Sequence, residues 1–196
     1  MPFNFDKAIA LEDNRVKLSP LIWEHFDEML PISLKNPALL QYSPSKFGTK
    51  ESLKAYFQSA FDLKQKQLRY SFAIFDKMKN SYAGSTSFGN ISNKDLRIEI
   101  GWTWLGKDFQ RTGLNRHCKF LLLQYVFEGL MFERVELKTD SRNEQSRKAI
   151  EAIGGKYEGE LRSHTLMPNG FRRNTVYYSI LKDEWNGIKV DKFKNR

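Results

Sequence analysis

The sequence predicts a mixed α/β fold of the α+β kind, with strands and helices around one sheet. Residues 71–75 and 82–88 are two strand-type runs around Lys79-Asn80, and a longer run follows at 97–105. Such a succession is typical of an antiparallel meander. A helical segment at 113–131 then leads to a strand at 134–139. This order favours a parallel pair joined by a crossover helix, so the sheet is expected to be mixed.

The N-terminal part adds one strand and two helices. Val16 and Leu18 alternate with polar residues, as in a short strand. Apolar residues at helical spacing indicate helices at 21–30 and 49–66, and Thr49 is a suitable residue to begin the second one. We expect the loop between the two helices to contain Pro31, Pro37 and Pro44.

The C-terminal part continues the alternation of helices and strands. A helix is expected at 143–153, where Gly154-Gly155 provides a stop, and two strands follow around the turn Pro168-Asn169-Gly170. No repeat or linker divides the chain. We therefore expect a single domain over residues 1–186 and a basic, frayed tail at 187–196.

The composition fits a folded, soluble domain. The 196 residues are 40% hydrophobic and 28% charged, which is enough apolar material for one core. The single cysteine, Cys118, excludes an internal disulfide and a multi-cysteine zinc site, and we expect it in the core. The N-terminus does not resemble a signal peptide, and the apolar stretch 120–132 is too short for a membrane span. We expect a cytoplasmic protein without metal or membrane.

The charge balance indicates the sign of possible partners. Lys and Arg number 32 against 23 Asp and Glu, a formal net charge of +9. This excess favours anionic partners such as RNA, a ribosomal surface or a phosphorylated cofactor. Because lysine is spread along the chain, ordinary surface solvation explains most of it.

The segment Gln110-Arg111-Thr112-Gly113-Leu114-Asn115 joins a predicted strand to the start of the long helix. The first main-chain N–H groups of a helix have no partner within it, and the helix dipole adds positive potential. Such a start can bind a diphosphate. Gly113 permits close approach of the backbone, and Arg111 and Arg116 add positive charge. A plain turn is the alternative interpretation.

The same segment resembles the acetyl-CoA loop of the GNAT (Gcn5-related) N-acetyltransferase superfamily, Q/R-x-x-G-x-G/A, with Asn115 in the last place. The branch that contains the ribosomal-protein N-terminal acetyltransferases is similar to three longer blocks, EIGWTWL…QRTGLN, RVELKTDSRNEQSRKAIEAIGGKYEGELR and MPNGFRRNTVYYSILKDEW. The resemblance implies acetyl-CoA as co-substrate and the GNAT fold, a mixed sheet of about seven strands with helices on both faces.

The resemblance also implies where the cofactor binds. It would lie between the strands at 97–105 and 134–139, with the loop on its diphosphate and the backbone near Trp104 and Leu105 on the pantetheine and acetyl carbonyl. Asn143 would bind the pantetheine arm, and Ser146 would donate a proton to the leaving thiolate. The pattern Ser141-x-x-Glu144 equally fits a capping box that only begins a helix. The cofactor-binding residues implied are Trp104, Leu105, Gln110, Arg111, Thr112, Gly113, Leu114, Asn115 and Asn143.

Acetyl transfer to an amine also needs a group that accepts a proton, because a lysine-like amine is protonated at pH 7. Glu99 is the first candidate base, directly or through a water. It should lie opposite the strand face of Ile98, Ile100, Trp102 and Trp104, where desolvation would raise its pKa. A salt-bridged structural carboxylate is the alternative. Glu136 and His164 are further candidates.

The acceptor is less constrained by the sequence. The family branch implies a protein N-terminal amine with a possible ribosomal contact, and a small-molecule amine is the alternative. Arg172 and Arg173, near the last turn, would suit an anionic acceptor. The competing interpretation is a non-catalytic module that senses CoA or binds RNA or the ribosome on the same fold. Either a monomer or a homodimer is compatible with the sequence.

Overall fold

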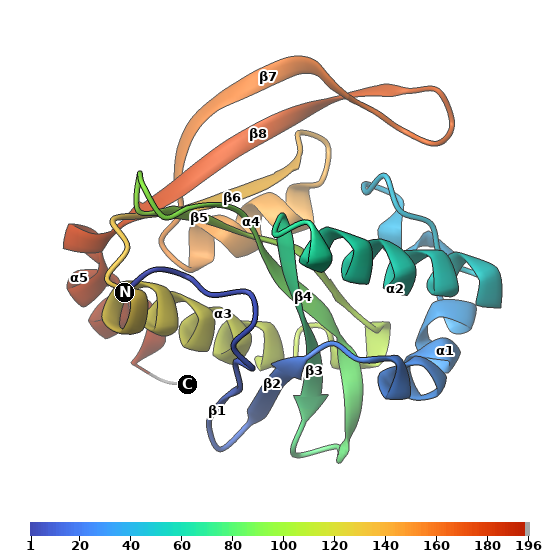
Figure 1. The fold of residues 1–196 in the computed structure, drawn as a ribbon. Coiled ribbons are helices and arrows are strands. Elements are labelled where there is room, and N and C mark those ends of the chain that lie inside the picture. Colours follow the sequence, from blue (N-terminus) through green and yellow to red (C-terminus); the bar gives the residue numbers. More distant parts are fainter. Residues whose placement is uncertain (195–196) are drawn as a thin grey trace.

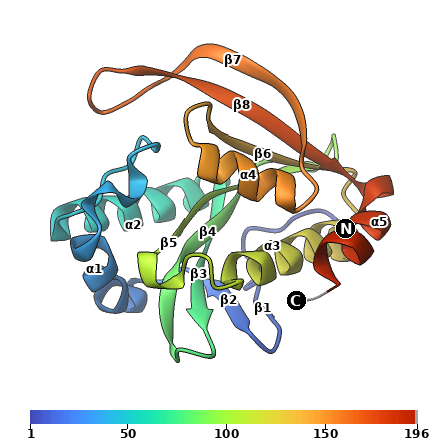
Figure 2. The ribbon, with the colours of Figure 1, turned by 180° about the vertical axis from the view of Figure 1, so that it is seen from behind.

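One mixed sheet of eight strands organises the computed structural model, which describes residues 1–194 (Figures 1 and 2). The strand order is β1-β2-β3-β4-β5-β6-β8-β7, and β5–β6 is the parallel pair in an otherwise antiparallel sheet. The predicted mixed sheet is confirmed, with eight strands instead of about seven; β1 has two residues, too few for a periodic pattern. The strands are β1 (Leu11–Glu12), β2 (Val16–Pro20), β3 (Arg69–Asp76), β4 (Ser81–Ser92), β5 (Arg97–Leu105), β6 (Arg134–Asp140), β7 (Lys156–Leu166) and β8 (Arg172–Leu181).

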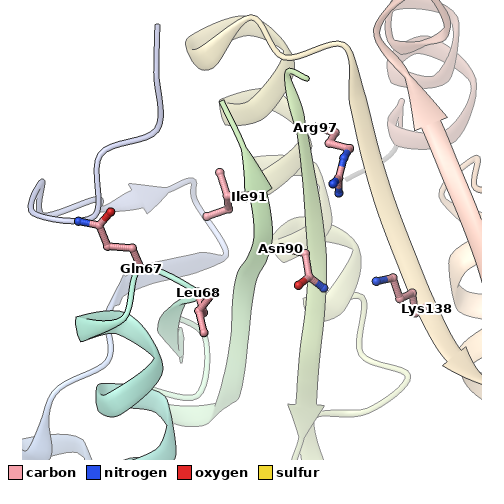
Figure 3. Close-up of a pocket in the computed structure, with 6 residues that line it drawn as sticks. All are labelled: Gln67, Leu68, Asn90, Ile91, Arg97 and Lys138. Atoms are coloured by element: carbon pink, nitrogen blue, oxygen red, sulfur yellow. The ribbon is translucent and has the colours of Figure 1, made fainter. Parts of the chain in front are cut away.

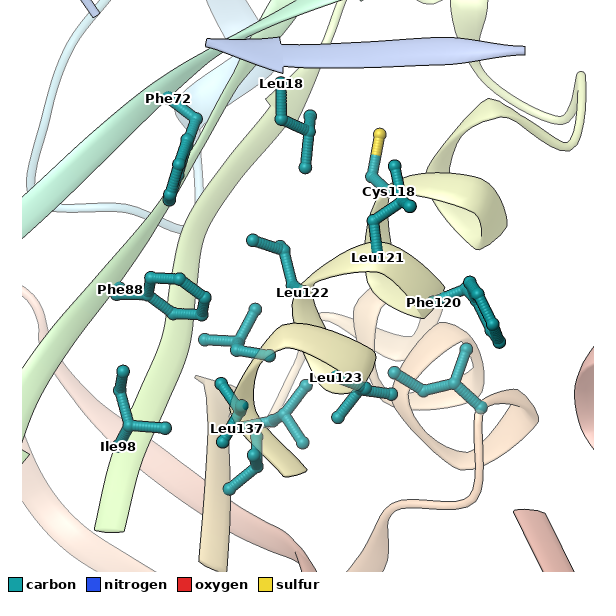
Figure 4. Close-up of a cluster of buried hydrophobic side chains, with 14 of the residues drawn as sticks. Leu18, Phe72, Phe88, Ile98, Cys118, Phe120, Leu121, Leu122, Leu123 and Leu137 are labelled. Carbon is teal, nitrogen blue, oxygen red and sulfur yellow. The ribbon is translucent and has the colours of Figure 1, made fainter. Parts of the chain in front are cut away.

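Helices cover both faces of the sheet, as expected. Helices α1 and α2 pack on one face, in a core cluster that includes Trp104. The other face carries α3, α4 and α5, and side chains of α3 fill the space between that helix and the strands (Figure 4). The helices are α1 (Phe26–Lys35), α2 (Lys50–Gln65), α3 (Leu114–Gln124), α4 (Glu144–Ala152) and α5 (Lys182–Phe193), with a π-helical turn at Tyr125–Leu130.

The predicted end of the first helix is wrong. After a short 3-10 turn, α1 continues through Pro31 to Lys35. Proline lacks the N–H that would bond the preceding turn, but Pro31 lies on the exposed side of the helix, where water can solvate the freed carbonyl. Met29 and Ser33 are fully buried on either side of it. Their packing holds the helix together across the proline.

The two strands of the parallel pair separate after three residues. Arg97, Ile98 and Glu99 of β5 pair with Arg134, Val135 and Glu136 of β6. From there β5 follows β4 and β6 follows β8, so within the described residues the later parts of β5 and β6 share no ladder. Main-chain groups along these inner edges are therefore available to a ligand.

A β-bulge in β5 changes which way its side chains point. The register with β4 shifts between Ser85 and Ser87, and Trp102 adopts a left-handed backbone with φ of 50°. A bulge adds one residue and so reverses the alternation of faces after it. The expectation that Trp102 and Trp104 share a face with Ile98 and Ile100 is consequently wrong. Both tryptophans lie on the α2 side, whereas the two isoleucines face α3.

The segment expected to be a frayed tail is largely helical. Residues 187–193 continue α5, and Phe193 is 2% exposed. Its ring lies 5.3 Å from that of Phe120 on α3 and 6.0 Å from that of Trp185. The last two residues of the expected tail, Asn195 and Arg196, lie outside the described residues. The end of α5 is thus part of the core.

We expect Phe193→Ala to lower the free energy of unfolding by about 3 kcal/mol, because it opens a cavity beside Phe120 and Trp185. Val190→Ala is the matched control, since Val190 is exposed on the same helix, and it should change stability by less than about 0.5 kcal/mol. Urea unfolding measures both. Equal midpoints for the two variants would show that α5 contributes little to the fold.

Candidate active site

Five consecutive main-chain N–H groups, those of residues 111–115, have no hydrogen-bond acceptor within residues 1–194. They sit where the loop after β5 enters α3. Arg111 and Gly113 both have left-handed backbone angles, with φ of 58° and 85°. A Cβ built on Gly113 would meet no atom within 4 Å, so the loop is open on this side. Free amides, an open approach and the positive end of α3 fit an anion such as a diphosphate.

The side chains of this loop divide into two groups. Leu114 is fully buried and anchors the helix start in the core, while Arg111 is exposed. Thr112 stabilises the turn through its hydroxyl, which donates to the Phe109 carbonyl at 2.8 Å. The Nη2 of Arg15, a buried residue that the sequence analysis missed, lies 3.5 Å from that same hydroxyl. The loop therefore holds its shape without using its main-chain amides.

Gln110 connects the loop to the two parted strands and to α4. Its amide nitrogen donates to the Leu105 carbonyl at 2.8 Å, and its oxygen accepts from Gln145 at 3.3 Å. The start of α4 consequently lies beside the start of α3. The Leu105 carbonyl of β5 therefore already accepts one hydrogen bond from the loop. The Trp104 side chain is buried on the α2 side of the strand, so only its backbone could contact a ligand between β5 and β6.

Two polar residues, Asn143 and Ser146, lie at the start of α4. Asn143 is the N-cap, and its Oδ1 accepts from the Ser146 amide at 3.1 Å. The N-cap of α4 is therefore Asn143. The capping-box interpretation, in which Ser141 would be the N-cap, is wrong. Within the described chain, no partner bonds the Asn143 side-chain nitrogen or the Ser146 hydroxyl. Both donors remain available for a ligand.

Glu99 lies on the α2 side of β5 and is 6% exposed. Its Oε2 accepts from Asn90 of β4 and pairs with Lys138 of β6 at 2.8 Å. Burial alone would lower the pKa of Lys138, but the Glu99 charge and hydrogen bond raise it above its ordinary value. No described group donates to Oε1, which lies 3.0 Å from the position of a Cβ on Gly101. The carboxylate is thus salt-bridged, fixed by one oxygen and open at the other.

The other two candidate bases lie nearby on the same side. Glu136 is paired with Glu99 across the parallel ladder and is held by Arg134 at 3.2 Å and Lys138 at 3.9 Å. His164 is on β7, where its Nδ1 lies 3.1 Å from the Thr175 hydroxyl and its ring 6.0 Å from Tyr177. Of the three, Glu99 is the one on the strand that carries the bulge.

Comparison with known proteins identifies this arrangement. A family model described as an acetyltransferase (GNAT) domain matches residues 15–156. The chain belongs to the GNAT family. The GNAT resemblance and the GNAT fold expected from the sequence are confirmed, with one strand more than anticipated.

Relatives with known sequence or structure support the GNAT assignment. YdaF of Bacillus subtilis (strain 168), provisionally named a ribosomal N-acetyltransferase, is 38% identical over 109 residues, or 56% of this chain and 58% of YdaF. N-acetyltransferase p20 of Bacillus licheniformis, uncharacterised by its name, is 28% identical over 116 residues, 59% of this chain and 64% of p20. The matches thus span less than two thirds of either relative.

Solved structures agree along nearly the whole chain. A GCN5-related N-acetyltransferase from Brucella melitensis superposes with a TM-score of 0.89 and 26% identity, covering 98% of this chain and 87% of that one. The ribosomal-protein-S5-alanine acetyltransferase from Vibrio fischeri gives a TM-score of 0.67 at 21% identity, over 90% and 98%. The latter likeness shows the GNAT fold alone.

Two further observations on this GNAT domain concern membrane-spanning helices and metal sites. None of the helices within residues 1–194 is long and apolar enough to span a membrane. Over the same residues, no three His, Cys, Asp or Glu side chains gather as a metal site would need.

Lys119 on α3 is a further residue that the sequence analysis missed. It is 6% exposed, and its Nζ donates to the Thr103 hydroxyl, at the bulge of β5, at 2.7 Å. Burial lowers the pKa of this amine from 10.5 to about 8. One turn earlier on the same helix, the Asn115 Oδ1 is buried without a partner. The sequence signal that could have shown this is the spacing of Asn115 and Lys119. Residues four apart lie on the same face of a helix, and this helix was expected to pack against the sheet.

We expect Lys119→Met to stabilise the protein, most at neutral pH. The buried amine loses its proton near pH 8, whereas in the unfolded chain it keeps it until about pH 10.5. Between these values the unfolded chain binds more protons, so wild-type stability rises with pH there. The advantage of Lys119→Met should therefore shrink by on the order of 3 kcal/mol across this window.

Urea unfolding at several pH values measures this difference. Lys148→Met, at an exposed position on α4, is the control and should show no such pH dependence. A constant difference between Lys119→Met and wild type would contradict the lowered pKa.

Proposed function

We propose that this chain is an acetyl-CoA-dependent N-acetyltransferase that transfers the acetyl group directly to a primary amine. The supporting observation is the row of free main-chain amides at residues 111–115, which follow the end of β5 beyond its separation from β6. The amides suit the diphosphate of the cofactor, and the parted strands offer main-chain groups to an extended arm. Acetyl-CoA supplies the activated acetyl thioester.

Glu99 is the proposed base. When the amine nitrogen attacks the acetyl carbon, it must lose a proton, and Glu99 Oε1 is the free carboxylate oxygen beside the bulge. Lys138 and Asn90 hold the other oxygen, which orients the carboxylate. A water between the amine and Oε1 would serve equally. Glu136 is less suited because Arg134 and Lys138 both engage it.

Ser146 is the proposed donor to the leaving group. As the carbon–sulfur bond breaks, the Ser146 hydroxyl, which has no other partner in the described chain, would donate a proton to the leaving sulfur and regain one from solvent water. Asn143 would bind the cofactor arm through its side-chain nitrogen, since its oxygen caps the helix. In this proposal, Glu99 accepts the proton of the amine and Ser146 donates a proton to the leaving sulfur.

The acceptor is proposed to be a protein N-terminal amine or a small-molecule amine. The name of YdaF favours a protein acceptor and a ribosomal contact. A reducing cytoplasm would suit the single, buried Cys118. The alternative, a non-catalytic module that senses CoA or binds RNA, would bind the cofactor or nucleic acid without turnover. Release of free thiol from acetyl-CoA in the presence of a panel of amines separates the two.

We expect Gly113→Ala to weaken acetyl-CoA binding about tenfold. Alanine at φ of 85° costs about 1–2 kcal/mol, and relief of this strain would turn the amides away from the diphosphate. Isothermal calorimetry measures the Kd. Gly159→Ala on β7 is the control, because its Cβ would meet no atom and its backbone is not left-handed. Identical affinities for the two variants would remove the loop from the cofactor site.

We expect Ser146→Ala to lower kcat about a hundredfold and to leave the Kd for acetyl-CoA within about twofold, because the hydroxyl acts only when the thiolate leaves. Ser141→Ala, three residues before the α4 helix begins, is the control and should retain kcat. Steady-state thiol release and calorimetry give the two constants. An equal loss of kcat and affinity, or no loss, would exclude Ser146 as the proton donor.

A further inference from the structure

Arg69 is a buried cation that no acidic residue neutralises. It begins β3, is 2% exposed, and forms no ion pair with any Asp or Glu of residues 1–194. Its Nε donates to the Ser87 hydroxyl at 2.9 Å and its Nη2 to the Tyr56 hydroxyl at 2.6 Å. Both acceptors are neutral. A charge withdrawn from water in this way is costly, so its retention suggests a use for the charge.

Two aromatic rings flank the Arg69 guanidinium, and one of its nitrogens has no hydrogen-bond acceptor among the described residues. Its Cζ lies 5.0 Å from the centre of the Tyr56 ring and 5.1 Å from that of Trp102. The Nη1 nitrogen donates to no described atom. Trp104, whose ring also packs against Tyr56, has a buried indole N–H that likewise lacks an acceptor. This part of the α2 side therefore has an excess of hydrogen-bond donors.

The guanidinium and the proposed base meet at one cross-strand pair. Arg69 is bonded to Ser87 of β4, and the free Oε1 of Glu99 lies over Gly101 of β5. Ser87 and Gly101 are directly paired in the antiparallel ladder. Opposed residues in such a ladder lie about 5 Å apart. The guanidinium and the free carboxylate oxygen are therefore close enough to contact one small molecule placed between them.

The Trp102 ring lies against Gly89 of β4, between Ser87 and a hollow that begins at Asn90. The indole is 36% exposed although it covers Arg69. A hollow of about 370 Å³ adjoins it and is lined by Gln67, Leu68, Asn90, Ile91, Arg97 and Lys138 (Figure 3). Asn90 and Lys138, which hold Glu99 Oε2, extend toward each other from β4 and β6 in that view. The hollow and the base therefore share two residues.

We infer that the amine acceptor also carries a carboxylate or phosphate group, which Arg69 binds beside the Trp102 ring while Glu99 accepts the amine proton. This inference rests on the proposed acetyltransferase function and narrows its acceptor. Because Ser87 and Gly101 are neighbours, the amine and the anion should be separated by only a few bonds. The acceptor is then a small amino acid or a short phosphorylated amine.

Matched pairs of acceptors test this inference. Thiol release from acetyl-CoA is measured with glycine against glycinamide, and with phosphoethanolamine against ethanolamine. In the wild-type protein we expect kcat/KM to favour the anionic member of at least one pair, and the pair that responds distinguishes carboxylate from phosphate. In Arg69→Gln this preference should fall by about tenfold to a hundredfold, the range for a hydrogen bond to a charged group. Comparison of the two proteins cancels the intrinsic reactivity of each amine.

Two further variants keep the result interpretable. Arg69→Lys retains the charge and should recover part of the preference, which a purely structural role would not produce. Lys189→Gln removes a cation from α5, on the other face of the sheet, and should leave the preference unchanged. Equal use of both members of each pair by the wild type, or the same preference in Arg69→Gln, would overturn the inference. Absence of turnover with every amine would instead overturn the proposed function.

Discussion

The early separation of β5 from β6 is the constraint on which the rest of the site depends. Only three residue pairs join these parallel strands, and each then stays with its antiparallel neighbour. A right-handed crossover through α3 brings the next strand back beside the first, so the helix start necessarily lies at the end where the strands diverge. The loop at 110–115 and the start of α4 meet there through Gln110 and Gln145. Ligands of open α/β sheets bind at such positions.

The bulge at Trp102 explains why buried charge accumulates around β5. One extra residue sends Trp102 toward Arg69 on the α2 side and Thr103 toward Lys119 on the α3 side. Neither cation has an acidic partner in the described chain, and a tryptophan at φ of 50° is itself strained. These features cost stability, and a fold selected only for stability would replace them. They are concentrated at two consecutive residues of one strand, Trp102 and Thr103, close to the proposed base Glu99.

The elements of this protein could be predicted from sequence more readily than the details of its site. Regular periodicity located α2, the β3–β4–β5 meander and the crossover helix, because each repeats its pattern over two or more turns or alternations. Helix-end chemistry and Gly113 predicted an anion-binding loop at residues 110–115, which stays a prediction because a plain turn fits the same residues. The bulge could not be found, since residues 97–105 alternate as an unbroken strand does and one added residue leaves no mark on composition. Lys119 and Arg69 were missed because a charged residue is assigned by default to the surface.

The reversal of faces at the bulge also favours direct transfer over a covalent intermediate on the protein. The proposed diphosphate loop and the start of α4 belong to the side of α3, where Cys118 is fully buried and its pKa is raised to about 12 by that burial. A thiol in this state is a poor nucleophile. Glu99 and Arg69 belong to the side of α2. In the proposed reaction, the thioester would approach from the α3 side and the amine from the α2 side. The two would meet where β5 and β6 share no ladder, in the gap beyond the Glu99–Glu136 pair. Both substrates can then be bound together, and the acetyl group needs no carrier between them.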